Sequence, residues 1–90
     1  MEFTATIRVR PKGEVRDPQG EAVAGALRAL GFTVADVRTG KEIVVRFDAV
    51  DEDAAREAAR TMGDQLLANP VIEVYDVELG EAAAADSLEV

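Results

Sequence analysis

The sequence contains neither cysteine nor histidine, and each absence excludes a class of function. Without cysteine the chain has no disulfide, no thiolate nucleophile and no redox pair. Without histidine it lacks the commonest general base and the commonest metal ligand. A structural zinc site is therefore excluded, and Mg²⁺ or Ca²⁺ bound by oxygen ligands is the one metal option that remains.

Long apolar runs are also missing. No stretch approaches the roughly 18 apolar residues of a membrane-spanning helix, and residues 1–10 lack the basic start and apolar core of a signal peptide. We therefore expect a cytoplasmic protein without membrane contact. Its 90 residues allow one domain of modest stability, which such domains often supplement by oligomerising.

Basic residues are scarce and unevenly placed. The chain has 10 Lys and Arg against 18 Asp and Glu, for a net charge of -8. Residues 1–48 hold 8 basic and 7 acidic residues, whereas residues 49–90 hold 2 and 11. This balance argues against nucleic-acid binding, which needs clustered Lys and Arg. The acidic half is either a solvated surface or a surface that steers the chain toward a basic partner.

The hydrophobic pattern predicts four strands and two helices. Strands are expected at 3–10, 32–38, 42–48 and 71–79, and helices at about 18–30 and from residue 51 or 53 to the Asn-Pro pair at 69–70. This order is that of a ferredoxin-like βαββαβ fold, with a four-stranded antiparallel sheet and two helices on one face. We expect one domain over residues 1–80 and a flexible, acidic, alanine-rich tail over residues 81–90.

The first helix has a clear signal at both ends. Asp17 is suited to cap its first turn and Pro18 to occupy its first position, while Gly31 can take the left-handed conformation that ends it. Gly20 and Gly25 lie inside the helix, where glycine costs roughly 1 kcal/mol against alanine. They are either tolerated defects or points of close approach by another backbone, and we favour close approach. The predicted buried stripe is Val23, Ala26, Leu27 and Leu30.

The remaining elements also show apolar faces. A tight turn at 39–41 makes 32–38 and 42–48 a predicted hairpin. Crowded carboxylates at 51–53 suit a helix start better than a cation site. The predicted apolar faces are Phe3, Ala5, Ile7 and Val9 of the first strand, Ile43, Val45 and Phe47 of the third, and Ala55, Ala58, Ala59, Met62 and Leu66 of the second helix. The last strand carries apolar residues on both faces, Ile72 and Val74 on one and Tyr75, Val77 and Leu79 on the other, so it is either buried on both sides or meets a partner.

Because this fold supports many functions, function has to come from a site. The basic segment 10–16 occupies the place of an acylphosphatase loop, but it lacks the glycine-rich cradle and a partner asparagine. Arg38, Lys41 and Arg46 are candidates to converge on an acidic partner or a phosphate, or else to blunt a strand edge. Tyr75 lies on a strand with two apolar faces, so it belongs to the core or to an interface.

Three segments resemble one family, the small PurS subunit of phosphoribosylformylglycinamidine synthase. They are Asp-Pro-Gln-Gly at 17–20 with the following helix, Val-Arg-Thr-Gly-Lys at 37–41, and Leu-Leu-Ala-Asn-Pro-Val-Ile-Glu at 66–73 with Tyr75 after it. The resemblance implies a non-catalytic subunit of a glutamine-dependent ligase in de novo purine synthesis. It also implies a homodimer or homotetramer that bridges a synthetase subunit (PurL) and a glutaminase subunit (PurQ) and supports ammonia transfer.

The resemblance assigns no catalytic residue, metal or cofactor to this chain, although the whole complex is expected to use ATP and Mg. The predicted interface residues are Asp17, Gln19, Gly20, Arg38, Lys41, Tyr75 and Val77. The leading alternative is a small-molecule-binding regulatory module of ferredoxin-like fold. A third possibility is a stand-alone acylphosphatase-like enzyme that depends on Arg16.

Overall fold

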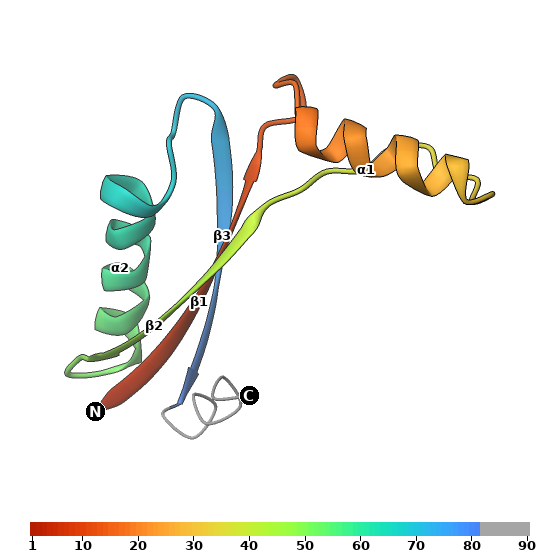
Figure 1. The fold of residues 1–90 in the computed structure, drawn as a ribbon. Helices are drawn as coiled ribbons and strands as arrows, with labels where there is room; N and C mark the ends of the chain where they lie inside the picture. Colours follow the sequence, from red (N-terminus) through yellow and green to blue (C-terminus); the bar gives the residue numbers. More distant parts are fainter. Residues whose placement is uncertain (82–90) are drawn as a thin grey trace.

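The computed structural model describes residues 1–81, which form an α+β domain of three strands and two α-helices (Figure 1). The elements follow the order β1 (Glu2–Pro11), α1 (Pro18–Ala29), β2 (Lys41–Asp48), α2 (Glu52–Met62), a π-helical turn η1 (Gly63–Leu67) and β3 (Glu73–Glu81). Residues 82–90 of the predicted tail lie outside the described residues.

The sheet is antiparallel and has the order β2-β1-β3, with β1 at its centre. Ile7 of β1 lies opposite Ile43 of β2 and Val77 of β3. The predicted apolar face of β1 is confirmed, because Phe3, Ala5, Ile7 and Val9 are all buried. Side chains alternate across a strand, so the opposite face carries Arg8, which bridges Glu42 of β2 and Glu78 of β3 at 3.0 Å each.

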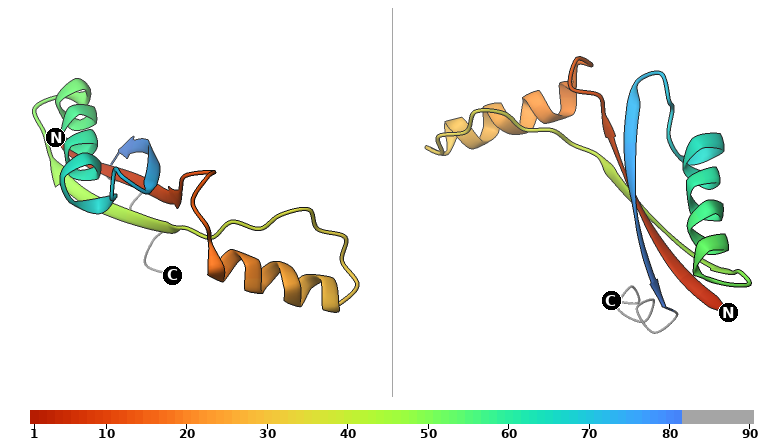
Figure 2. Two further views of the ribbon diagram at one scale, coloured as in Figure 1. Left: turned by 90° about the horizontal axis from the view of Figure 1, so that it is seen from above. Right: turned by 180° about the vertical axis from the view of Figure 1, so that it is seen from behind.

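Helix α2 covers the apolar face of the sheet (Figures 1 and 2). Asp51 caps it by accepting a hydrogen bond from the Ala54 amide at 2.8 Å, and the small side chains of Ala55 and Ala59 are fully buried against the strands. The predicted burial of Leu66 is wrong, since that side chain is 82% exposed. The π turn over η1 adds a residue to the helical repeat, so Leu67 packs against the core instead.

The predicted fourth strand at 32–38 is absent, and the sheet has three strands rather than four. This segment returns along α1 in irregular form, and no hairpin forms at 39–41. Arg28 of α1 binds the carbonyl oxygens of Val34 and Ala35 at 3.1 and 3.3 Å. Those backbone acceptors are therefore taken by a side chain rather than by a neighbouring strand. In the single chain, no strand among residues 1–81 pairs with the outer edge of β2.

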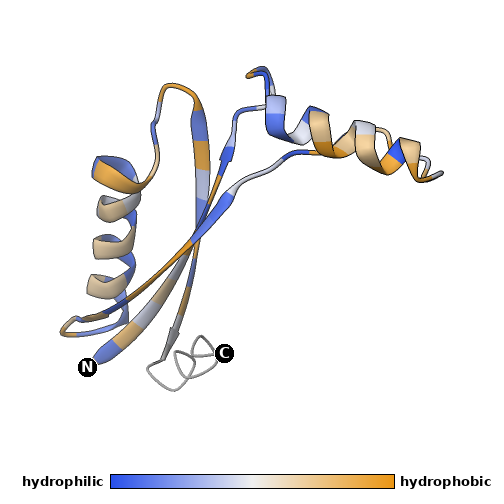
Figure 3. Ribbon diagram, viewed as in Figure 1, coloured by the Kyte–Doolittle hydropathy of each residue, from blue (hydrophilic) through white to orange (hydrophobic). Residues whose placement is uncertain are grey.

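Helix α1 has the predicted ends but not the predicted position. Gly31 has φ +96°, and the Phe32 amide binds the Leu27 carbonyl oxygen at 3.0 Å, which closes the helix as expected. The expectation that both helices cover one face is wrong, because α1 projects beyond the end of the sheet (Figures 1 and 2). As a result, the side chains of Val23 in α1 and of Leu30 and Phe32 just after it are exposed, and Figure 3 shows that this projecting helix is rich in hydrophobic residues.

Candidate functional site

The N-terminus of α1 is fixed by one buried carboxylate, that of Asp17. Asp17 is 6% exposed and accepts the Gly20 amide at 2.9 Å as the cap of α1. It also accepts the Thr39 amide at 2.7 Å and the Thr39 hydroxyl at 3.1 Å. Asp17 therefore ties the start of the helix to the segment that leads into β2.

These contacts also set the charge state of Asp17. The Thr39 amide, followed by the Gly20 amide, holds the pKa of the Asp17 carboxyl below its usual range. The Thr39 hydroxyl and the positive charge of Arg38 act in the same direction, while desolvation opposes them. Asp17 is therefore a firmly ionised structural anchor, which is the opposite of what a general acid requires.

Two further contacts fix the same junction. Arg38 donates from Nη2 to the carbonyl oxygens of Lys12 and Val15, at 2.8 Å each. A Cβ atom added to Gly20 would lie 2.3 Å from the Val37 carbonyl oxygen. The close approach predicted at Gly20 is thus present and lies within the fold, whereas Gly25 has no neighbouring atom within 4 Å of an added Cβ.

Positive charge gathers beside this junction. Arg38 and Lys41 line an open pocket of about 360 Å³ together with Arg10, whose guanidinium pairs with Asp76 at 3.1 Å. Lys41 also lines a neighbouring pocket of about 240 Å³ with Gln19. Arg46 does not join them, because it pairs with Glu2 at the far end of the sheet.

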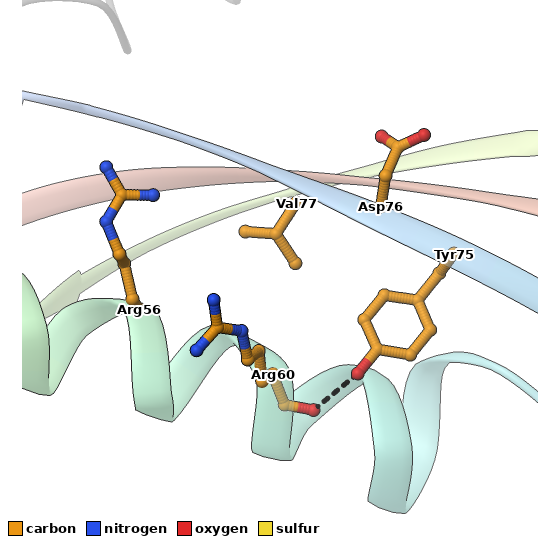
Figure 4. Close-up of a pocket in the computed structure, with 5 residues that line it drawn as sticks. All are labelled: Arg56, Arg60, Tyr75, Asp76 and Val77. Atoms are coloured by element: carbon orange, nitrogen blue, oxygen red, sulfur yellow. Dashed lines mark hydrogen bonds between the residues drawn. The ribbon is translucent and has the colours of Figure 1, made fainter.

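Five of the seven predicted interface residues meet at this junction, but Tyr75 and Val77 do not. Those two lie between β3 and α2 and line a second pocket of about 290 Å³ with Arg56 and Arg60 (Figure 4). The Tyr75 hydroxyl donates to Asp64 Oδ1 at 2.6 Å and lies 3.0 Å from the Arg60 carbonyl oxygen. The Asp64 contact, with burial, raises the pKa of Tyr75.

Sequence reasoning missed four important positions. Thr39 was assigned to a turn, yet it is the partner of Asp17. Gly63 received no packing role, yet a Cβ there would lie 2.6 Å from the Tyr75 ring. Arg56 and Arg60 received no role, although their four-residue spacing signals a shared helix face.

Other chemistry finds little support among residues 1–81. No group of three Asp or Glu side chains there is arranged to hold a metal ion, and no helix in that range is long and apolar enough to cross a membrane. Arg16, the candidate phosphate ligand, instead forms a surface ion pair with Glu21 at 3.0 Å.

A small sheet covered by one helix, with a second helix that projects from it and exposes apolar side chains, is typical of a chain that associates with another. The comparisons agree with this class. The family model PurS, described as phosphoribosylformylglycinamidine (FGAM) synthase, matches residues 4–81. The chain therefore belongs to the PurS family and is a small subunit of the FGAM synthase ligase of purine biosynthesis.

Individual relatives match over most of the chain. The PurS subunit of Synechocystis is 46% identical over 86% of this chain and 78% of its own length. The solved structure of Thermus thermophilus PurS has a TM-score of 0.82 at 45% identity, covering 90% of this chain and 98% of that one. A chain in the structure of PurLQS from Thermotoga maritima has a TM-score of 0.82 at 35% identity, covering 88% and 98%.

Proposed function

We propose that this chain acts as a non-catalytic homodimer or homotetramer that bridges the synthetase (PurL) and glutaminase (PurQ) subunits and supports ammonia transfer between them. Family membership supports the partners, since a similar chain occurs in the PurLQS structure from Thermotoga maritima. ATP and Mg belong to the chemistry of the complex, and this chain needs neither for the bridging role. The expected location is the cytoplasm.

The observation that carries the proposal is the exposure of α1. Leu30 is 75% exposed and Phe32 is 59% exposed, and Val23 is also in solvent. An apolar helix face without cover is typical of an interaction site. A chain whose fold leaves such a face open requires a partner to bury it.

A second copy of the chain is the occupant that we propose for this face. Helix α2 leaves Ile43, Val45 and Phe47 of β2 only half-buried, so the apolar face of the sheet has room beside it. A two-fold axis would place the α1 of each copy on the sheet of the other. This exchange restores two helices per sheet face, which is the arrangement that the sequence pattern favours.

Two charge substitutions test the dimer without disturbing the single chain. Leu30→Asp with Phe32→Asp changes side chains that the isolated fold exposes, so the helix content measured by circular dichroism should persist. Sedimentation is expected to give a wild-type oligomer and a monomeric variant. Val50→Asp, at an exposed position after β2, is the matched control and should stay oligomeric. A double variant with the wild-type mass would disprove the α1 interface.

The bridging role is tested by amidation of formylglycinamide ribonucleotide with glutamine or with ammonia as nitrogen source. The synthetase and glutaminase subunits are assayed with and without this chain. We expect glutamine-dependent activity to require the chain and ammonia-dependent activity to be less affected. If both activities are indifferent to the chain, the bridging role is wrong.

A further inference from the structure

The pocket between α2 and β3 combines an open strand edge with two arginines. β3 pairs with β1 on one side only, and no strand among residues 1–81 covers its other edge. Such an edge leaves backbone N–H and C=O groups available to another chain. α2 runs beside this strand (Figure 1), so side chains of the helix reach the space that an added strand would enter.

Arg56 and Arg60 supply positive charge at this edge. They are the only basic residues after residue 48, in a half of the chain with 11 acidic residues. Both guanidinium groups extend from α2 toward the sheet, and Val77 projects from β3 toward the helix (Figure 4). A random scatter of charges would not be expected to place both remaining cations on one face of one pocket.

The carboxylates near the pocket leave these cations largely uncompensated. Asp64 keeps its charge, but it accepts from the Tyr75 hydroxyl at 2.6 Å and forms no ion pair with Arg60. Asp76 contributes to the pocket lining, but its carboxylate points away from Arg56 and Arg60 (Figure 4) and binds Arg10. Glu52 approaches Arg56 only to 3.9 Å, and no ion pair involves Arg60 within residues 1–81. The pocket therefore favours an anionic occupant.

The spacing of the two arginines matches an extended chain. Residues four apart on a helix are separated by about 6 Å along its axis, while alternate residues of a strand are separated by about 7 Å. An incoming strand that pairs with β3 can therefore present two same-face carboxylates, one to Arg56 and one to Arg60. Val77 adds an apolar side chain to the pocket from the strand side (Figure 4).

We propose that this pocket binds an extended acidic segment of a partner subunit, which adds a strand to the free edge of β3 and pairs two carboxylates with Arg56 and Arg60. The backbone supplies affinity and the arginines supply specificity and register. The inference rests on the proposed function, because the segment is assigned to another subunit of the synthase. It concerns a different surface from the α1 interface.

The test is calorimetric binding of the full chain to a mixture of the synthetase and glutaminase subunits. Arg56→Gln with Arg60→Gln removes both charges but retains polarity and part of the aliphatic stem, and we expect binding at least about tenfold weaker than wild type. Its dependence on salt concentration should also decrease. The control is Arg16→Gln with Arg46→Gln, which removes two exposed arginines that form surface ion pairs elsewhere and should bind like wild type.

Hydrogen exchange of the same complex locates the contact. Amides of residues 74–80 should exchange more slowly in the wild-type complex than in the free chain. Equal binding by the wild type and the Arg56/Arg60 variant would overturn the inference, as would protection of α2 without protection of β3, which would indicate a small anion. Loss of self-association in that variant would overturn it in favour of a second copy. Failure of the wild type itself to bind would instead refute the proposed function.

Discussion

The same substitution at two positions of α1 should have opposite effects on stability. Gly25→Ala introduces a methyl group into open space, so the helix gains about 0.5–1 kcal/mol from the lower backbone entropy of the unfolded chain. Gly20→Ala gains the same propensity but places its Cβ 2.3 Å from the Val37 carbonyl oxygen. A carbon atom does not normally approach a carbonyl oxygen closer than about 3.3 Å, so α1 and the 33–40 segment must separate by about 1 Å.

That separation breaks the contact between Asp17 and the Thr39 amide, which is 2.7 Å long in the wild type. Overpacking typically costs about 1–3 kcal/mol, so the net loss for Gly20→Ala is about 1–2 kcal/mol. The two variants should therefore differ by about 1.5–3 kcal/mol in urea unfolding at one fixed protomer concentration. The fixed concentration matters because association contributes to apparent stability. A Gly20→Ala variant as stable as Gly25→Ala would show that α1 does not contact residue 37.

The remaining predictions concern the core and the junction. Ile7→Ala removes a fully buried side chain between Ile43 and Val77 and should lower the free energy of unfolding by about 2–5 kcal/mol, whereas an unchanged urea midpoint would place Ile7 outside the core. Asp17→Asn tests the lowered pKa of this carboxyl. A lowered folded-state pKa contributes stability above the unfolded value of about 3.9, and this stability is lost as the pH falls through the folded value. The variant should therefore be less stable than wild type at pH 7 and show a shallower loss of stability below about pH 4; parallel curves would contradict the anchor role.

Local signals predicted much of this structure because they report local physics. The Asp17 cap, the left-handed Gly31 and the alternating buried face of β1 each depend on a few neighbouring residues. The sequence could also predict which residues meet at the start of α1, for a related reason. Asp17, Gln19 and Gly20 start α1, while Arg38 and Lys41 lead into β2, so a single connection between these two points brings all five together.

The failures come from contacts that the local pattern does not contain. The pattern of the 32–38 segment argues against a regular strand, since Val34 and Val37 cannot share one face of such a strand. The carbonyl groups of Val34 and Ala35 accept from Arg28 instead, and a side-chain contact of this kind leaves no trace in the hydrophobic periodicity. Leu66 was misplaced because a π turn shifts the helical repeat by one residue.

The position of α1 raises a different question, because its apolar stripe was predicted to be buried, whereas the single chain leaves most of it exposed. An apolar stripe indicates that one face of a helix is to be buried, but it does not indicate whether the same chain or another chain buries it. The α1 face and the α2–β3 pocket also differ in chemistry, since one is apolar and the other is cationic. The proposed function, in which the chain holds a copy of itself and a different protein at once, needs two such separable surfaces. Variants at Leu30 and Phe32 should therefore affect self-association, while variants at Arg56 and Arg60 should affect partner binding, each without the other.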